Sequence, residues 1–213
     1  MKKIIFAIFI LFPLLSFAQL QVIAGVGFMV VKQNGIVLVP SSQIPGFSVK
    51  SIVDRKLFTF GGTITGFYRL SRSPVPGKVS IGPQFGFGFH STRLKKSNDS
   101  AYRPDPSLAG WKRTFGPINV PLEFAVRFGN MSDPENYPFG LSLAAGVDFF
   151  YLRLADEIGF AALPCGSVIF MMGKTGARLG FHLMEFRSVY NSNVGEVDRL
   201  TNSFTSFELV RAF

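Results

Sequence analysis

The fold is decided by residues 78–90 (KVSIGPQFGFGFH) and 118–129 (INVPLEFAVRFG), which both alternate between two kinds of side chain. In the first stretch every second residue from Val79 to Phe89 is apolar or proline, and the residues between them are polar or glycine. Residues 138–151 (PFGLSLAAGVDFFY) follow the same pattern, with apolar residues on one parity and small or polar residues on the other. A period of two is typical of β-strands whose two faces meet different surroundings.

The length of these strands favours a membrane. Each alternating run is about 12 residues long, whereas soluble strands average about five or six. A tilted strand needs about 9–11 residues to cross a bilayer. Five more segments show weaker strand patterns, and they are residues 20–31, 58–70, 159–172, 177–190 and 201–213. We therefore predict an all-β fold, a transmembrane antiparallel up-and-down β-barrel of about eight strands.

Three positions are expected to disturb these strands. The alternation in residues 177–190 changes phase at Met184, which predicts a bulge there and places Glu185 and Arg187 on the polar side. Pro83 and Pro121 each remove a backbone donor from the ladder, so local bulges are expected at both.

The first 18 residues have the pattern of a cleaved signal peptide. Lys2 and Lys3 precede an apolar stretch, residues 4–15, and small residues Ser16 and Ala18 stand at the positions before the expected cleavage site. About twelve apolar residues are too few for a spanning helix, which needs roughly 20. The sequence therefore predicts export, with residues 19–213 forming the barrel domain.

The connections between the predicted strands indicate an orientation. If the chain enters the barrel from the periplasm, the two longest connections, residues 32–57 and 91–117, face outward and the three periplasmic turns are short. Long outer loops and short inner turns are typical of outer-membrane barrels. An even number of strands also returns the C-terminus to the periplasmic side, so we expect the outer membrane as the location.

Composition excludes several other classes of protein. The 47% of hydrophobic residues argue against a disordered chain, and only 16% are charged, which disfavours nucleic-acid binding despite the net charge of +9. The single cysteine, Cys165, excludes an intrachain disulfide framework and a paired-cysteine metal site. The sequence contains no G-x-G-x-x-G, Walker A or H-E-x-x-H motif, and two histidines do not make a ligand set, so neither a cofactor nor a metal is expected.

The polar side chains that alternate with the apolar ones would face differently in a soluble β protein and in a membrane barrel. In a soluble sandwich or lipocalin-like barrel they would be the solvent-exposed outer face. In an eight-stranded membrane barrel they would fill the interior, with acidic and basic groups paired and no open channel. The predicted interior polar network consists of Arg69, Lys78, Glu123, Arg127, Asp148, Arg178, Glu185 and Arg187, and His182 lies on the same parity.

The two long connections are basic. Residues 91–117 carry six basic and two acidic side chains, and residues 32–57 carry four basic and one acidic. Such loops are expected to be held electrostatically on anionic lipopolysaccharide, with Tyr102 and Trp111 anchored among the headgroups. The predicted contact residues are Lys95, Lys96, Lys112 and Arg113. An acidic extracellular ligand or partner protein is the alternative.

From residue 19 to residue 213 the chain resembles the PorT-like outer-membrane β-barrel domain family. Residues 118–128 (INVPLEFAVRF) are similar to the family's "IEIPLLLKYRF"-type strand, with Pro121 in the same place, and the Gly-rich segment from Gly140 to Phe149 is similar to its next strand. Phe213 resembles the terminal aromatic of the barrel-assembly signal, although Arg211 stands where that signal usually has an apolar residue. The resemblance implies a barrel and recognition by the barrel-assembly machinery, and it implies no activity.

His90 and Ser91 are an adjacent pair of a possible base and a possible nucleophile. Consecutive strand residues point to opposite faces, so we expect no hydrogen bond between them and no catalytic residues. We therefore predict a structural or interaction role in the cell envelope: integrity, adhesion or accessory to a membrane assembly. Its expected partners are outer-membrane lipids, lipopolysaccharide, the assembly machinery and an envelope protein. The alternatives are an outer-membrane lipid hydrolase using His90 and Ser91, and a soluble periplasmic lipid carrier with its Phe-rich parity around a cavity.

Overall fold

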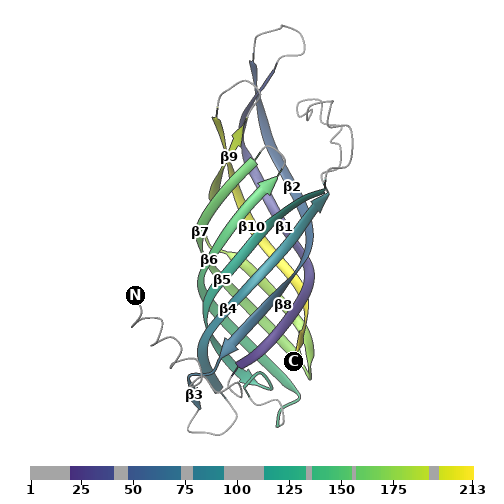
Figure 1. The fold of residues 1–213 in the computed structure, drawn as a ribbon, viewed down its shortest axis with the longest axis vertical. Helices are drawn as coiled ribbons and strands as arrows, with labels where there is room; N and C mark the ends of the chain where they lie inside the picture. The colour runs from purple at the N-terminus through teal and green to yellow at the C-terminus, as the bar shows by residue number, and fades with distance from the viewer. Residues whose placement is uncertain are drawn as a thin grey trace, which may run out of the picture.

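The computed structural model describes residues 20–40, 48–72, 79–93, 113–132, 136–154, 157–191 and 197–213, and the described elements are all β-strands. Figure 1 shows them wound into one tilted barrel. The long strands are β1 (Leu20–Pro40), β2 (Ser48–Tyr68), β4 (Val79–Arg93), β5 (Arg113–Gly129), β6 (Phe139–Leu154), β7 (Glu157–Met172) and β10 (Val197–Ala212). The shorter ones are β3 (Ser71–Arg72), β8 (Thr175–His182) and β9 (Phe186–Asn191).

Every long strand pairs antiparallel with its neighbours, and the sheet closes on itself. The order is β1-β2-β4-β5-β6-β7-β8-β10, and β9 continues β8 between β7 and β10. The sheet is closed by β1 and β10, whose pairing runs from Ile23 opposite Ala212 to Gly35 opposite Leu200. Closure removes the two open edges that the sheet would otherwise have between β1 and β10. The predicted antiparallel up-and-down barrel with eight strand positions is confirmed.

The two ends of the barrel differ. The chain enters and leaves at one end, which we call the terminal end, where the backbone N–H of Phe213 donates to the carbonyl of Val22 at 3.0 Å. The β7–β8 turn at Gly173 and Lys174 also lies there, and Gly173 adopts the φ of +60° that favours glycine. At the opposite loop end, the β1–β2 hairpin projects furthest beyond the other strands (Figure 1).

The apolar parity of the strands faces outward. Large exposed apolar side chains occur on β1, β2, β4, β5, β6, β7, β8 and β10, and Phe58 and Phe60 are each about two-thirds exposed, at 65% and 64%. The opposite parity faces inward. It is mostly small or polar in β4, β5 and β6 and includes buried apolar residues in β1 and β7. This orientation contradicts the alternative of a soluble carrier with phenylalanines around an internal cavity. A closed barrel with an apolar outer belt is the form in which strands cross a bilayer.

The prolines disturb the ladder less than expected. The β4–β5 register is the same on both sides of Pro83 and Pro121, so the bulges predicted at these residues are wrong. Opposite Pro121 the sheet accommodates the ring with Gly86, where an added Cβ would lie 2.9 Å from the proline Cγ. The β4–β5 register shifts instead between Phe89 and Ser91, at the loop end.

A substitution at Gly27 would test how tightly β1 and β10 pack where the barrel closes. Gly27 faces inward, and a side chain there would collide with the carbonyl oxygen of Phe207 and the backbone of Glu208. We expect Gly27→Val to destabilise the refolded barrel by about 3 kcal/mol, the upper end for overpacking. The measurement is urea unfolding in detergent micelles, in which the folded fraction is monitored by the gel mobility of unboiled samples. Thr205→Val, on the exposed face of the same seam, is the control, and equal stability of the two variants would contradict the prediction.

Candidate functional site: the buried polar interior

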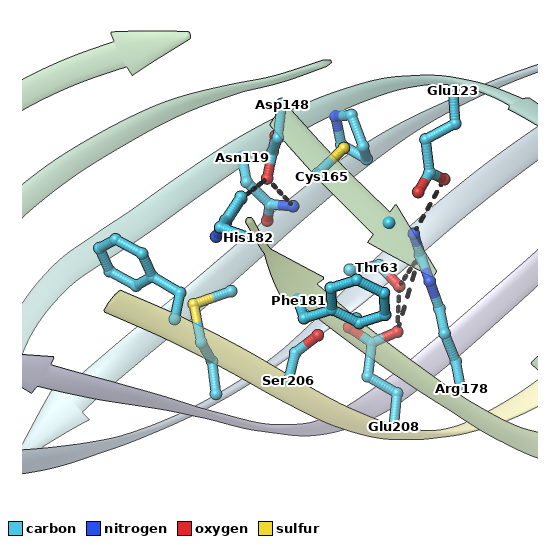
Figure 2. A pocket seen from close by; sticks show the side chains of 15 residues that line it. Thr63, Asn119, Glu123, Asp148, Cys165, Arg178, Phe181, His182, Ser206 and Glu208 are labelled. Carbon is cyan, nitrogen blue, oxygen red and sulfur yellow. Dashed lines mark hydrogen bonds and ion pairs between the residues drawn. The ribbon is translucent and has the colours of Figure 1, made fainter. Parts of the chain in front are cut away.

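A buried arginine lies between two buried glutamates in the middle of the barrel. Arg178, on β8, places Nη2 3.4 Å from Oε2 of Glu123 on β5 and Nη1 4.0 Å from Oε2 of Glu208 on β10. Figure 2 shows the three side chains converging from different walls. Thr63 donates to Glu208 at 2.5 Å, and Arg178 donates to Thr65 at 3.0 Å. One cation thus offsets two carboxylates that would otherwise repel each other in a low dielectric.

The network continues from Glu123 toward the terminal end. Glu123 accepts hydrogen bonds from Ser167 at 2.8 Å and from the amide of Gln84 at 2.6 Å. Gln84 in turn accepts one from Nη2 of Arg127 at 2.9 Å. Arg127 is completely buried, and its Nη1 donates to Gln21 at 2.6 Å. Its guanidinium also covers the ring of Phe67, 3.9 Å from the centroid.

A second polar group lies closer to the loop end. His182 Nε2 and Asp148 Oδ2 are 2.8 Å apart, and the same oxygen accepts a hydrogen bond from the Asn119 amide at 3.3 Å. The imidazole is packed edge-on against Phe150 and Phe204, with ring centroids 5.4 and 5.3 Å away. These apolar neighbours fix the orientation of the ring.

Two apolar clusters flank the polar groups. The loop-side cluster consists of Met29, Val31, Phe150, Leu152, Leu163 and Phe204. The terminal-side cluster consists of Ile23, Met131, Ile169, Met171 and Val210. Side chains therefore fill the lumen along its described length, as expected for a barrel of eight strands.

The polar groups border a small cavity. It has a volume of about 30 Å³ and is lined by residues that include Thr63, Asn119, Asp148, Cys165 and Ser206. In the described structure Asn119 Oδ1 and Asp148 Oδ1 are buried and make no hydrogen bond. A polar cavity of this size holds one or two water molecules. It is too small for an organic cofactor.

The described interior does not assemble a metal centre. Among the described residues, no group of three His, Cys, Asp or Glu side chains is placed to hold a metal ion. Arg178 also occupies the position between Glu123 and Glu208 where a cation would have to lie. The arrangement is suited to holding the strands in register through charge-assisted hydrogen bonds.

The structure brings together part of the predicted interior network. Glu123, Arg127, Asp148 and Arg178 are buried inside, as is the partner histidine of Asp148. Arg69 is half-buried at the terminal end and donates to the carbonyl of Ser132. Lys78 lies outside the described residues.

The prediction that Glu185 and Arg187 face the interior is wrong, because both side chains are exposed. The strand is interrupted between His182 and Phe186, and relative to β10 it gains two residues there. An even insertion leaves the alternation of faces unchanged. Glu185 and Arg187 therefore keep the outward parity of Leu179 and Leu183, and the apparent phase change at Met184 does not move them inside.

Several interior residues were missed from the sequence. Glu208 was not identified because residues 201–213 look mixed, yet it stands between two outward apolar residues, Phe207 and Leu209. That local alternation was the signal that could have placed Glu208 inside. Thr63 and Gln84 lie on the polar parity of their strands, but the predicted network was limited to charged residues. Ser167 was missed because residues 159–172 show no clear alternation.

His90 and Ser91 lie on opposite faces of β4. His90 is buried in the interior, whereas the Ser91 hydroxyl donates to the carbonyl of Phe60 at 3.4 Å near the surface. The pair is therefore not arranged as a nucleophile and its base. His90 and His182 come from β4 and β8, which are not neighbours in the sheet.

The remaining predicted sites are at the chain ends and in the loops. The backbone of Phe213 is tied to β1, and its ring is exposed. Arg113 begins β5, but its side chain is outside the described part of the structure. The same is true of residues 1–18, the predicted signal peptide, and of Lys95, Lys96, Tyr102, Trp111 and Lys112.

Comparison with known proteins finds similarity in structure only. No family model and no curated protein matches the chain, so the resemblance to PorT-like barrels stays a prediction. Similar solved structures include the outer membrane protein OprG from Pseudomonas aeruginosa (12% identity, TM-score 0.41) and Ail, the attachment invasion locus protein of Yersinia pestis (7%, 0.35). Each matches 91% of this chain, over 95% and 98% of its own length respectively.

A third similar structure is the COG4313 outer membrane channel from Pseudomonas putida F1. It has 13% identity and a TM-score of 0.26, and the match covers 91% of this chain and 95% of the channel. Within the described residues, no helix has the length and apolar character needed to span a membrane.

Arg178 tests whether the network stabilises the barrel. Arg178→Met keeps most of the side-chain volume but leaves Glu123 and Glu208 buried without their cation, and we expect a loss of about 3–5 kcal/mol of unfolding free energy. Adding Glu123→Gln and Glu208→Gln removes both uncompensated charges and should recover most of it. Arg187→Met, an exposed control, should change stability by no more than about 0.5 kcal/mol. Equal effects of Arg178→Met and Arg187→Met in urea unfolding would contradict a structural role for the network.

Proposed function

We propose that this chain is a small outer-membrane β-barrel with a structural or interaction role in the cell envelope, exercised through its basic outer loops. The observation that carries the proposal is the filled interior, where Arg178, Glu123 and Glu208 are buried and tied to each other. Because side chains fill the lumen, it offers no space for a ligand. Contacts with other molecules are therefore assigned to the loop end.

The outer membrane is supported by the form of the barrel and by the sequence. Closed barrels with an apolar belt, short turns at the terminal end and longer connections at the other end are typical of that membrane. The β7–β8 turn is only Gly173 and Lys174, whereas β1 and β2 extend as a long hairpin on the loop side. The predicted signal peptide provides the route for export.

The interior supports a closed barrel rather than a pore. Arg127 stacks on Phe67 near the terminal end, and Phe150 packs against Phe204 with ring centroids 4.1 Å apart toward the loop end. These contacts occupy the lumen at both levels. The proposed partners are outer-membrane lipids and lipopolysaccharide, with Phe213 offered to the barrel-assembly machinery and the outer loops also available to an envelope protein.

Charge reversal in the third connection tests the contact with lipopolysaccharide. We expect replacement of Lys95, Lys96, Lys112 and Arg113 by Glu to weaken binding at least about tenfold at low salt, because like charges replace attraction. Binding is measured by titrating the refolded barrel in detergent with purified lipopolysaccharide and following light scattering. The control is the replacement of Ser97, Asn98, Ser100 and Ser107 in the same connection by Gln, which changes four side chains and no charge. Unchanged binding by the fourfold variant would overturn the loop proposal without affecting the barrel.

Planar bilayers test the closed interior. The wild-type barrel is expected to insert without stable conductance steps, since its lumen is filled by side chains. A porin, whose interior is a water-filled channel, serves as the positive control for conductance. Steady ion conductance through the wild-type protein would contradict a structural, non-porous barrel.

A further inference from the structure

A groove runs along the outer wall of the barrel at the terminal end, where β7, β8, β10 and β1 lie side by side. Its volume is about 650 Å³, within the range of about 300–1,000 Å³ typical of small-molecule sites. Its lining is mainly apolar and includes Ala24, Val26, Phe170, Met172 and Leu209. The groove is separate from the polar interior because these side chains belong to the outward parity.

The strand register explains why the wall is hollow there. Ala177, on β8, pairs with Phe170 on β7 and with Leu209 on β10, so one small side chain lies between two large ones. One step nearer the terminal end, Thr175 pairs in the same way with Met172 and Arg211. The floor of the groove is therefore β8, and the walls are the longer side chains of β7 and β10.

A cation stands at the terminal end of this groove. Arg211 is exposed and is the one charged residue among the described residues that line it. Lys174 is exposed in the adjoining turn, next to Thr175. The ring of Phe213 lies beside Arg211, 5.9 Å from its guanidinium carbon, and is 77% exposed. Arginine and lysine side chains near the ends of membrane-spanning segments reach the depth at which lipid headgroups lie.

We propose that the groove binds one glycerophospholipid with an anionic headgroup, from the leaflet at the terminal end. An acyl chain lies over Ala177, between Phe170 and Leu209, and the lipid phosphate is bound by Arg211 with Lys174 nearby. The inference rests on the barrel being embedded in a membrane and is independent of what the outer loops contact.

Shape and charge favour a lipid over a second copy of the chain. The floor is one side chain wide, which suits a flexible acyl chain better than the convex apolar belt of another barrel. A two-fold dimer formed through this wall would also place both copies of Arg211 in one interface, and the lining residues include no acid to neutralise them. The planar guanidinium, by contrast, matches a phosphate with two parallel hydrogen bonds.

The site also explains the sequence departure at the C-terminus. Arg211 replaces an apolar residue in the terminal strand pattern, and a cation facing lipid is costly at the bilayer midplane but cheap near the interface. Its position one residue from the end of β10 places it where that cost is lowest. Phosphate binding gives the charge a favourable contact there.

The test uses the full-length mature barrel, refolded from urea into detergent micelles so that assembly in cells is not a factor. Phosphatidylglycerol and phosphatidylcholine with identical acyl chains are titrated separately, and lipid occupancy is counted by native mass spectrometry. We expect one phosphatidylglycerol to bind the wild-type barrel about tenfold more tightly than phosphatidylcholine, because both lipids offer a phosphate but only phosphatidylcholine carries a choline cation, which Arg211 and Lys174 repel.

Two variants and two matched controls separate the groove from the rest of the belt. Arg211→Gln should weaken the binding of phosphatidylglycerol more than that of phosphatidylcholine and so reduce the preference, and Ala177→Phe, which fills the floor, should weaken the binding of both lipids. Lys32→Gln removes an exposed cation and Ala145→Phe enlarges an exposed alanine on other parts of the outer surface, and neither should have an effect.

The outcomes distinguish this inference from the proposed function. If the wild-type protein shows no heat-dependent gel mobility and stays in the soluble fraction, the proposed membrane barrel itself fails. If it folds as a barrel but binds both lipids equally, or binds phosphatidylglycerol equally in Arg211→Gln and Lys32→Gln, the lipid site is overturned and the barrel stands. A dimer that Ala177→Phe disrupts would likewise overturn the lipid site and assign the groove to a second copy.

Discussion

The pairing of β1 with β10 is the interaction on which the rest of the structure depends. Without water in the bilayer, each unpaired N–H and C=O group of an open sheet would cost several kcal/mol. Closure from Ile23 opposite Ala212 to Gly35 opposite Leu200 removes that cost along the whole seam. Once the sheet is closed, each side chain has only two environments, lipid or lumen. The alternation of phenylalanine with glycine and polar residues follows from that constraint, and so does the narrow lumen that the inward side chains must fill.

Burying charge in this lumen is expensive, and the residues present limit the cost by sharing. Arg178 contacts carboxylates from two other strands, and Glu123 also accepts hydrogen bonds from Ser167 and Gln84. A buried ion pair adds little net stability compared with an apolar core, but losing one partner is severely destabilising. The network therefore penalises wrong registers: a shift of β8 or β10 by one residue would turn Arg178 or Glu208 toward lipid. The apolar clusters on either side contribute packing and leave the polar groups to specify alignment.

The sequence indicates the fold where the two faces of a strand differ most. Residues 78–90, 118–129 and 138–151 alternate clearly because their inward side chains are mostly small or polar. In β7 the inward residues include Leu163, Ile169 and Met171, which pack in the two apolar clusters. With both faces apolar, no period is visible, although the strand is regular. Glu185 and Arg187 were misplaced for another reason: their charges indicated a change of phase at Met184, although the two residues inserted there relative to β10 leave the alternation unchanged.

The distribution of outward charge indicates where such a barrel can make polar contacts. Among the described residues, outward charges lie near the two rims, with Lys32, Lys56, Glu185 and Arg187 toward the loop end and Lys174 and Arg211 toward the terminal end. The belt between them is apolar because a lipid-facing charge becomes more costly with depth. Recognition of anything polar is therefore confined to two rings, one exposed to the medium and one at the opposite headgroup layer. At the terminal rim, the cation Arg211 stands at the end of the groove in the apolar belt. Neither the closure of the sheet nor the filling of its lumen requires a cation and a groove to occur together.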